Sequence, residues 1–129
     1  MTTEELKQKQ LALLEETAAF YNSNNRAENE KGGCYYTLIV NGEERGCAIG
    51  RKIADKSLCE KFNLMGGRNY SPSVKQVFYM IPFELQELGI NFLTSIQSLH
   101  DIKDNWNLEG LSERGKKYVE DIKFQYKLG

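Results

Sequence analysis

The sequence predicts a small α+β fold in which one antiparallel β-hairpin packs against four or five helices in a single domain. The dipeptide Asn41-Gly42 separates two short β-prone runs, residues 35–40 and 43–47. It predicts a hairpin because a type I′ turn requires positive φ at both central residues. Elsewhere, apolar residues recur at steps of three and four, which is typical of helices. The length of 129 residues and the 40% hydrophobic content suit one globular domain with its own core.

The first element is predicted to be an amphipathic helix over residues 3–22. Thr2 followed by Glu5 is a capping-box pattern at its start. A polar surface loop follows and leads to the hairpin. Residues 47–53 are short and mixed, and they predict an exit from the second strand into a helical turn. A short helix is predicted at residues 58–62.

The next helical segment is predicted to start at Ser71-Pro72. Serine is a good N-cap, and proline is favoured at the first helical position. Helical periodicity then extends over residues 74–88. Pro82 lies inside this run and lacks a backbone N–H, so we expect a kink or break there. A strand at residues 77–81 is the competing interpretation.

Two further helices are predicted near the C-terminus. Asn91 is predicted to cap the first of them, and residues 105–110 are predicted to form a loop. Ser112 is predicted to cap the last helix, which extends through Tyr126. We expect the exit of the hairpin, residues 47–50, to meet the end of the penultimate helix.

Composition excludes several classes of function. The net charge is −1 and neither half of the chain is strongly basic, which argues against a duplex-DNA binder. No run approaches the ~20 apolar residues of a membrane helix, and the acidic N-terminus does not resemble a secretory signal. Three widely spaced cysteines favour free thiols in a reducing compartment. We therefore expect a cytoplasmic protein that does not bind membranes.

Short motifs are spaced along most of the chain. They are a Cys-x-Tyr start to the hairpin, a Cys-Ala-x-Gly turn after it and a His-Asp helix end followed by a tryptophan. Their members are Cys34, Tyr36, Cys47, Ala48, Gly50, His100, Asp101 and Trp106. In this order they resemble a family of small, mostly uncharacterised bacterial and phage proteins. The resemblance implies a phage or mobile-element protein and brings little settled activity with it.

His100 is the only histidine, and Asp101 beside it can orient the imidazole. If Cys47 faces His100, the pair forms a thiol–imidazole dyad suited to nucleophilic catalysis. In the alternative, His100 ties the helix to the hairpin turn through a hydrogen bond, and Cys47 is a small buried hydrophobe. Ligand binding without covalent chemistry is the third interpretation.

A structural zinc site is a further hypothesis. Cys34, Cys47, Cys59 and His100 give the Cys₃His count that zinc accepts. The usual Cys-x₂₋₄-Cys pairing is absent, which favours three reduced cysteines instead. We therefore predict neither a metal nor another cofactor.

Basic and aromatic residues suggest a ligand pocket. Arg68 follows two glycines before a predicted helix start, an arrangement that can hold an anion. With Arg45, Arg51 and Lys52 it can line a pocket for a phosphorylated ligand, although a surface loop and solvated charges are the simpler interpretation. Tyr36 and Trp106 are expected near this pocket, where their rings can stack a base.

Three functions follow from these patterns. The first is a non-enzymatic binding protein of phage type, acting in counter-defence by sequestering a small anionic, nucleotide-like ligand or by blocking a host protein. The second is a small hydrolase or transferase using Cys47, His100 and Asp101. The third is a structural accessory protein without a ligand. Homo-oligomerisation is left open. The predicted ligand-binding residues are Tyr36, Arg45, Cys47, Gly50, Arg51, Arg68, His100 and Trp106.

Overall fold

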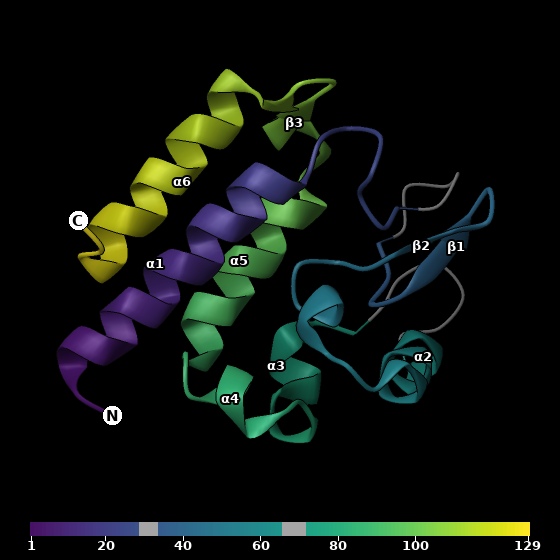
Figure 1. Cartoon of the computed structure of the whole chain (residues 1–129), viewed down its shortest axis with the longest axis horizontal. Coiled ribbons are helices and arrows are strands. Elements are labelled where there is room, and N and C mark those ends of the chain that lie inside the picture. Colours follow the sequence, from purple (N-terminus) through teal and green to yellow (C-terminus); the bar gives the residue numbers. More distant parts are fainter. Residues whose placement is uncertain (29–33, 66–71) are drawn as a thin grey trace.

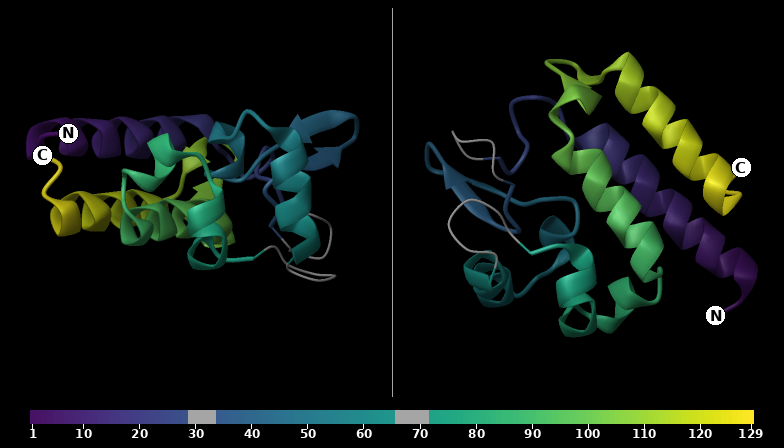
Figure 2. Two further views of the ribbon diagram at one scale, coloured as in Figure 1. Left: turned by 90° about the horizontal axis from the view of Figure 1, so that it is seen from below. Right: turned by 180° about the vertical axis from the view of Figure 1, so that it is seen from behind.

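Three long helices lie side by side in one half of the molecule (Figure 1). They are α1 (Thr3–Phe20), α5 (Ile90–Asp101) and α6 (Glu113–Tyr126). Figure 2 shows α1 lying over α5 and α6, with both termini at the end of this layer away from the hairpin. The computed structural model describes residues 1–28, 34–65 and 72–129. With six α-helices and two small antiparallel sheets in these ranges, it confirms the predicted α+β class.

Helix α1 is capped as the sequence predicts. The backbone N–H of Glu5 donates to the Thr2 hydroxyl at 3.1 Å, which satisfies one of the free donors of the first turn. Leu14 and Thr17 are fully buried on its inner face. The Thr17 hydroxyl donates to the Leu13 carbonyl at 2.7 Å, so its burial leaves no unpaired polar group. The helix ends at Phe20, two residues before the predicted end.

The predicted hairpin is confirmed. Strands β1 (Leu38–Val40) and β2 (Glu43–Arg45) pair antiparallel, with Val40 opposite Glu43. Asn41 and Gly42 have φ values of 51° and 80°, as a type I′ turn requires. The strands are shorter than predicted because the flanking residues bond outside the ladder, to Ala27 in the case of the Tyr35 N–H. The backbone N–H of Tyr36, for example, donates to the Asn63 side chain at 2.9 Å.

The chain leaves β2 through a helical turn, as predicted. This turn is the 3₁₀ helix η1 (Gly50–Lys52), and α2 (Lys56–Met65) follows it. Helix α2 starts earlier and ends later than the predicted helix. Its start is stabilised by Asp55, whose carboxylate accepts from the backbone N–H of Ser57 at 3.0 Å.

Pro82 breaks the following helical run, as expected. The run is divided into α3 (Val74–Val77), the 3₁₀ helix η2 (Phe78–Met80) and α4 (Phe83–Gln86). Ile81, the residue before the proline, is extended because proline disfavours the helical region there. The competing strand at residues 77–81 is wrong.

The predicted start of α3 is wrong. The N-cap is Ser73, whose capping box with Gln76 fixes the first turn. Pro72 therefore precedes the cap instead of occupying the first helical position. Ser71, the predicted cap, lies outside the described residues.

Two predictions near the C-terminus need correction. Asn91 does not cap α5, because Gly89, with φ of 94°, precedes the first helical residue. The predicted loop contains a second hairpin, β3 (Trp106–Asn107) and β4 (Gly110–Leu111). The Asn107 carboxamide oxygen accepts from the backbone N–H of Gly110 at 3.1 Å and closes the turn. Ser112 caps α6 as predicted.

The hairpin exit meets α5, as expected. The backbone N–H of Ile49 donates to the Gln97 side chain at 3.2 Å. Fully buried apolar side chains from both halves meet around this contact, among them Leu14, Tyr36, Cys47, Ile49, Phe62, Leu93, Ile96 and Leu99. Across the described residues, no helix is both long enough and apolar enough to cross a membrane.

Candidate functional site

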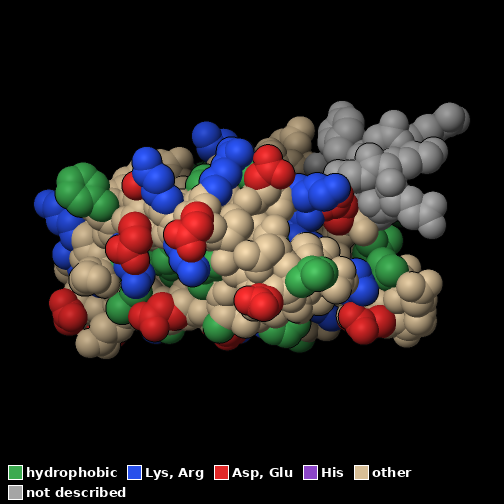
Figure 3. Space-filling view, turned by 90° about the horizontal axis from the view of Figure 1, so that it is seen from above, with side chains coloured by type: hydrophobic (Ala, Val, Ile, Leu, Met, Phe, Trp, Pro, Cys, Tyr) green, Lys and Arg blue, Asp and Glu red, His purple; other side chains and the backbone are tan. Residues whose placement is uncertain are grey.

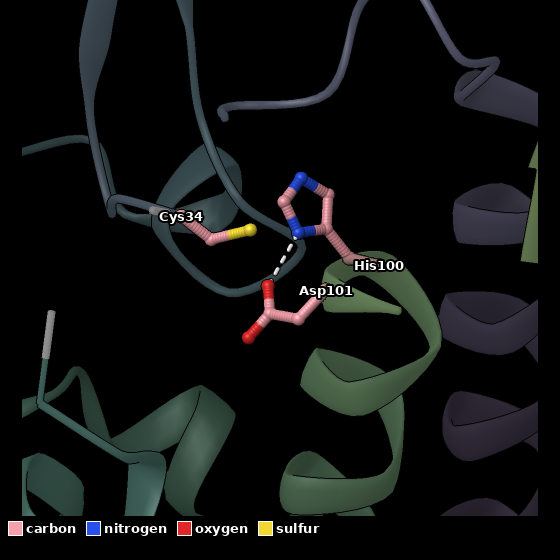
Figure 4. A group of neighbouring side chains, drawn as sticks. All are labelled: Cys34, His100 and Asp101. Carbon is pink, nitrogen blue, oxygen red and sulfur yellow. Dashed lines mark hydrogen bonds and ion pairs between the residues drawn. The ribbon is translucent and has the colours of Figure 1, made fainter. Parts of the chain in front are cut away.

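The only histidine of the chain, a predicted site residue, lies in the last turn of α5. His100 is fully buried, and its Nδ1 lies 2.7 Å from Oδ1 of Asp101 (Figure 4). Its Nε2 accepts a hydrogen bond from the backbone N–H of Ala27 at 3.1 Å. Since Nε2 needs a lone pair to accept, the neutral ring carries its proton on Nδ1 and donates to Asp101.

Arg26 closes the end of α5. Only 3% of its surface is exposed, and its Nε and Nη2 donate to the carbonyls of His100 and Asp101, each at 2.7 Å. Glu28 forms an ion pair with the same guanidinium. The last carbonyls of a helix lack partners within the helix and carry its negative partial charge, so a buried cation stabilises them.

Trp106 and Tyr21 complete this helix end. The indole N–H of Trp106 donates to the Leu99 carbonyl at 2.9 Å. The Tyr21 ring packs edge-on against both His100 and Trp106, and its hydroxyl donates to the Gly46 carbonyl at 2.7 Å. Trp106 is 5% exposed and therefore lies in the core, so its ring is not available to stack a ligand as the sequence suggested.

Cys34 lies beside His100 and Asp101, on the chain that leads into β1 (Figure 4). Its Sγ is 3.6 Å from Nη2 of Arg26. Burial and the negative charge of Asp101 raise the pKa of the Cys34 thiol to about 12. The thiol is therefore protonated at neutral pH and is a poor nucleophile.

Cys47 does not join this group. It is fully buried, and its sulfur accepts from the backbone N–H of Gly50 at 3.3 Å. Burial and the charge of Asp101 raise the pKa of the Cys47 thiol above its ordinary value. The structure thus groups His100 and Asp101 with Cys34, where the sequence suggested Cys47.

The hypothetical Cys₃His zinc site does not form in the described chain. Cys59 points to the Gly50 carbonyl, with its sulfur 3.6 Å from the oxygen, and none of the three cysteines forms a disulfide. Among the described residues, only Cys34 groups with His100, and the third member of that group is Asp101.

The Cys34–His100–Asp101 group is itself poorly suited to a cation. A metal on Nδ1 of His100 would require the ring proton to move to Nε2, where it would face the N–H of Ala27. The guanidinium of Arg26 beside the sulfur adds a positive charge. This arrangement supports a hydrogen-bonded helix end.

Tyr36 and Gly50, also predicted to bind a ligand, contact each other inside the protein. The Tyr36 hydroxyl donates to the Pro72 carbonyl at 3.0 Å, and the side chain is fully buried. A Cβ added to Gly50 would lie 2.0 Å from the Tyr36 carbonyl oxygen. Glycine is therefore required here for close backbone packing.

Arg45 and Arg51 line one hollow. This hollow, the Arg51 pocket, has a volume of about 180 Å³ and lies between the end of α1, strand β2 and η1. Its lining residues are Phe20, Asn25, Glu43, Glu44, Arg45, Gly46, Arg51 and Lys56. Arg68, the third predicted cation, lies outside the described residues.

The guanidinium of Arg51 is held on two sides. Its Nη2 lies 2.5 Å from the Glu16 carboxylate, and its central carbon lies 4.0 Å from the centre of the Phe20 ring. Burial opposes ionisation of Glu16, but hydrogen bonds from Lys52 and Arg51 outweigh it and lower the pKa of that carboxyl. Nε of Arg51 is buried and has no hydrogen-bond partner, so the guanidinium is only partly satisfied.

The other charges of the Arg51 pocket are weakly paired. Arg45 Nε lies 3.2 Å from the Glu43 carboxylate, and Lys56 Nζ lies 4.0 Å from that of Glu44. Lys56 also donates to the carbonyl of Ile53 at 2.9 Å. The pocket therefore presents three cations and two carboxylates, and ion pairs as exposed as these contribute little stability.

One face of the protein mixes both signs of charge. On the face shown in Figure 3, Lys and Arg side chains alternate with Asp and Glu among the described residues. This distribution agrees with the net charge of −1. It does not resemble the basic stripe of a duplex-DNA binder.

Comparison with known proteins adds no relative. No protein-family model matches the chain, and neither a curated protein nor a solved structure matches it. The resemblance to small bacterial and phage proteins therefore stays a prediction.

Sequence reasoning missed several residues that shape these sites. Arg26 and Ala27 lie in a polar run whose composition gave no sign of burial. Phe20 and Lys56 were not among the predicted ligand-binding residues, yet both line the Arg51 pocket. The charge of Lys56, close to Arg51 and Lys52 in sequence, was the one signal that could have placed it in the pocket.

Proposed function

We propose that this is a non-enzymatic binding protein that holds the anionic group of a small ligand in the Arg51 pocket. The observation that carries the proposal is the convergence of Arg45, Arg51 and Lys56 on one hollow. Arg51 is already oriented by Phe20 and Glu16, so binding an anion costs little side-chain entropy.

The helix end around His100 supports a binding role over catalysis. A general base needs a free ring nitrogen within reach of its substrate, and both nitrogens of His100 have partners inside the protein. Raised pKa values keep the thiols of Cys34 and Cys47 protonated. These features do not suit the hydrolase or transferase hypothesis.

Calorimetric titration at low ionic strength tests the proposal, with inorganic phosphate, acetate and AMP as probes. Arg51→Gln should weaken binding at least about tenfold, the loss of one charge-assisted hydrogen bond. Lys103→Gln, an exposed cation outside the pocket, is the matched control and should bind like the wild type. Equal affinity of Arg51→Gln and wild type, or no binding of any carboxylate or phosphate ligand, amino acids included, would overturn the proposal.

We further propose that the protein acts in phage counter-defence in the cytoplasm of a bacterial host, by sequestering such a ligand. The resemblance to phage proteins supports this role. Three cysteines that form no disulfide suit a reducing compartment. Deletion of the gene from a phage should lower plaque formation on a host with the matching defence, and Arg51→Gln should fail to restore it.

Blocking of a host protein is the second candidate. Tyr79 and Phe83, on either side of the break at Pro82, are 85% and 69% exposed. Exposed aromatic side chains are frequent anchors at protein interfaces. A Tyr79→Ser/Phe83→Ser variant should then lose counter-defence while binding anions like the wild type.

A further inference from the structure

We infer that the Arg51 pocket is built for a small zwitterion of the amino-acid type, with a carboxylate and an ammonium group one carbon apart. The inference rests on the proposed function and narrows its ligand class. It is drawn from the volume of the pocket, from the exposed fractions of its charged side chains, and from the position of each sign of charge.

Size excludes a whole nucleotide. The pocket measures about 180 Å³. Sites that enclose drug-sized ligands occupy about 300–1,000 Å³. A ligand held inside this hollow is therefore a small metabolite, and a nucleotide would leave its base or ribose in solvent.

The two signs of charge lie at different depths. The side chains of Arg45 and Arg51 are only 19% and 21% exposed, whereas those of Glu43 and Glu44 are 63% and 55% exposed. The two arginines thus form the inner wall, the carboxylates form the rim, and Lys56, at 38% exposure, lies between them. A ligand with its negative group inward and its positive group at the mouth complements both.

An amino acid has this polarity. Its carboxylate suits the planar guanidinium of Arg51, which can donate two parallel hydrogen bonds. Its ammonium group would lie near Glu43 and Glu44 at the rim. The exposed part of the Phe20 ring, at 47% exposure, offers an apolar surface to a small side chain.

Inorganic phosphate and acetate fit less well. Either anion would meet the guanidinium of Arg51 but would place negative charge near the two rim carboxylates without compensation. The negative charge of the ligand and those of the rim carboxylates repel each other, and this repulsion is strongest at low ionic strength. The rim should therefore select the zwitterion over simple anions.

The test compares L-alanine with acetate, ethylamine and inorganic phosphate by calorimetric titration of the full chain at low ionic strength. Wild type should bind L-alanine at least tenfold more tightly than acetate and should not bind ethylamine. A Glu43→Gln/Glu44→Gln variant should lose that preference and bind phosphate more tightly than wild type does. Both glutamates are exposed, so the variant should fold normally, which circular dichroism checks. Glu113→Gln, an exposed glutamate at the start of α6, is the matched control.

The outcomes separate the two proposals. If acetate or phosphate binds as tightly as L-alanine, or if the double variant keeps its preference, the zwitterion inference is wrong and the anion pocket stands. If no probe binds and Arg51→Gln behaves like wild type, both proposals fall.

Discussion

The backbone N–H of Ala27 donates to Nε2 of His100 at 3.1 Å, across 73 positions of the chain. Both residues are fully buried. This one hydrogen bond fixes the imidazole tautomer, and the tautomer in turn directs Nδ1–H to Asp101. It also holds the segment after α1 against the end of α5, where Arg26 caps the last carbonyls. The only histidine of the chain therefore joins two distant segments.

Replacement of His100 should lower stability strongly. His100→Ala removes a buried ring and leaves the N–H of Ala27 without an acceptor, so we expect a loss of about 2–5 kcal/mol in the free energy of unfolding. Urea denaturation followed by circular dichroism measures this loss. Lys103→Ala, at an exposed position nearby, should change stability by less than about 0.5 kcal/mol.

A second variant separates the hydrogen bond from the packing of the ring. His100→Phe keeps an aromatic ring at the position but cannot accept from Ala27, so it should still lose about 1–3 kcal/mol, the cost of a buried unpaired donor. A His100→Phe protein as stable as wild type would show that this hydrogen bond contributes no stability.

Stability should fall in alkaline solution. The pKa of the Cys34 thiol rises from its ordinary 9.0 to about 12 in the folded protein, because burial and Asp101 disfavour the thiolate. A group with a raised folded-state pKa contributes its full stability below pH 9 and loses it progressively as the pH rises from 9 toward 12. Burial raises the pKa of Cys47 and Tyr21 in the same direction.

Urea midpoints at pH 8, 10 and 11 measure this dependence. Cys34→Ser does not titrate in this range, so its midpoint should fall less steeply with pH than that of wild type. Thiol alkylation at pH 8 provides a second measurement, in which Cys34 should react far more slowly in the native protein than in urea. Alkylation of native Cys34 at the rate of a free thiol would contradict the raised pKa.

Zinc should not bind to the Cys34–His100–Asp101 group. Binding through Nδ1 would reverse the tautomer that Ala27 imposes, and Arg26 adds a positive charge 3.6 Å from the sulfur. Equilibrium dialysis with Zn²⁺ should leave the protein metal-free, and Co²⁺ should produce no thiolate charge-transfer absorption. A stoichiometric ion that is lost in Cys34→Ser would refute this interpretation.

Local signals predicted the fold well. The residues that act on their own or adjacent backbone behaved as expected. The hairpin turn formed at Asn41-Gly42, helices start after Thr2 and Ser112, and the helical run is broken at Pro82. The second hairpin was missed because it depends on one side chain, Asn107, which accepts from backbone N–H groups two and three residues later.

The candidate site was less predictable because it depends on long-range packing. Motif spacing cannot show that Tyr36 and Trp106 point into the core, or that Ala27 occupies one nitrogen of His100. Arg45, Arg51 and Lys52 were grouped because of their charge. The structure brings the two arginines to one hollow, whereas Lys52 does not line it and pairs with Glu16 instead. The role of Glu43 and Glu44 at the rim could not be predicted, because it depends on how exposed each side chain is in the folded protein.

Gly50→Ala should destabilise the protein more than any exposed glycine substitution. The added Cβ would lie 2.0 Å from the Tyr36 carbonyl oxygen, so the backbone must move, at a cost of about 3 kcal/mol or more. Gly42→Ala is the matched control, because its Cβ meets no atom within 4 Å and only the positive φ of 80° is strained. It should cost about 1 kcal/mol. Urea denaturation of both variants measures the difference.

The same variants bear on the Arg51 pocket. Since Gly50 precedes Arg51 in η1, the backbone shift in folded Gly50→Ala protein should also weaken anion binding, whereas Gly42→Ala should bind normally. Equal stability of the two variants would mean that the close approach of Gly50 to Tyr36 does not constrain the fold.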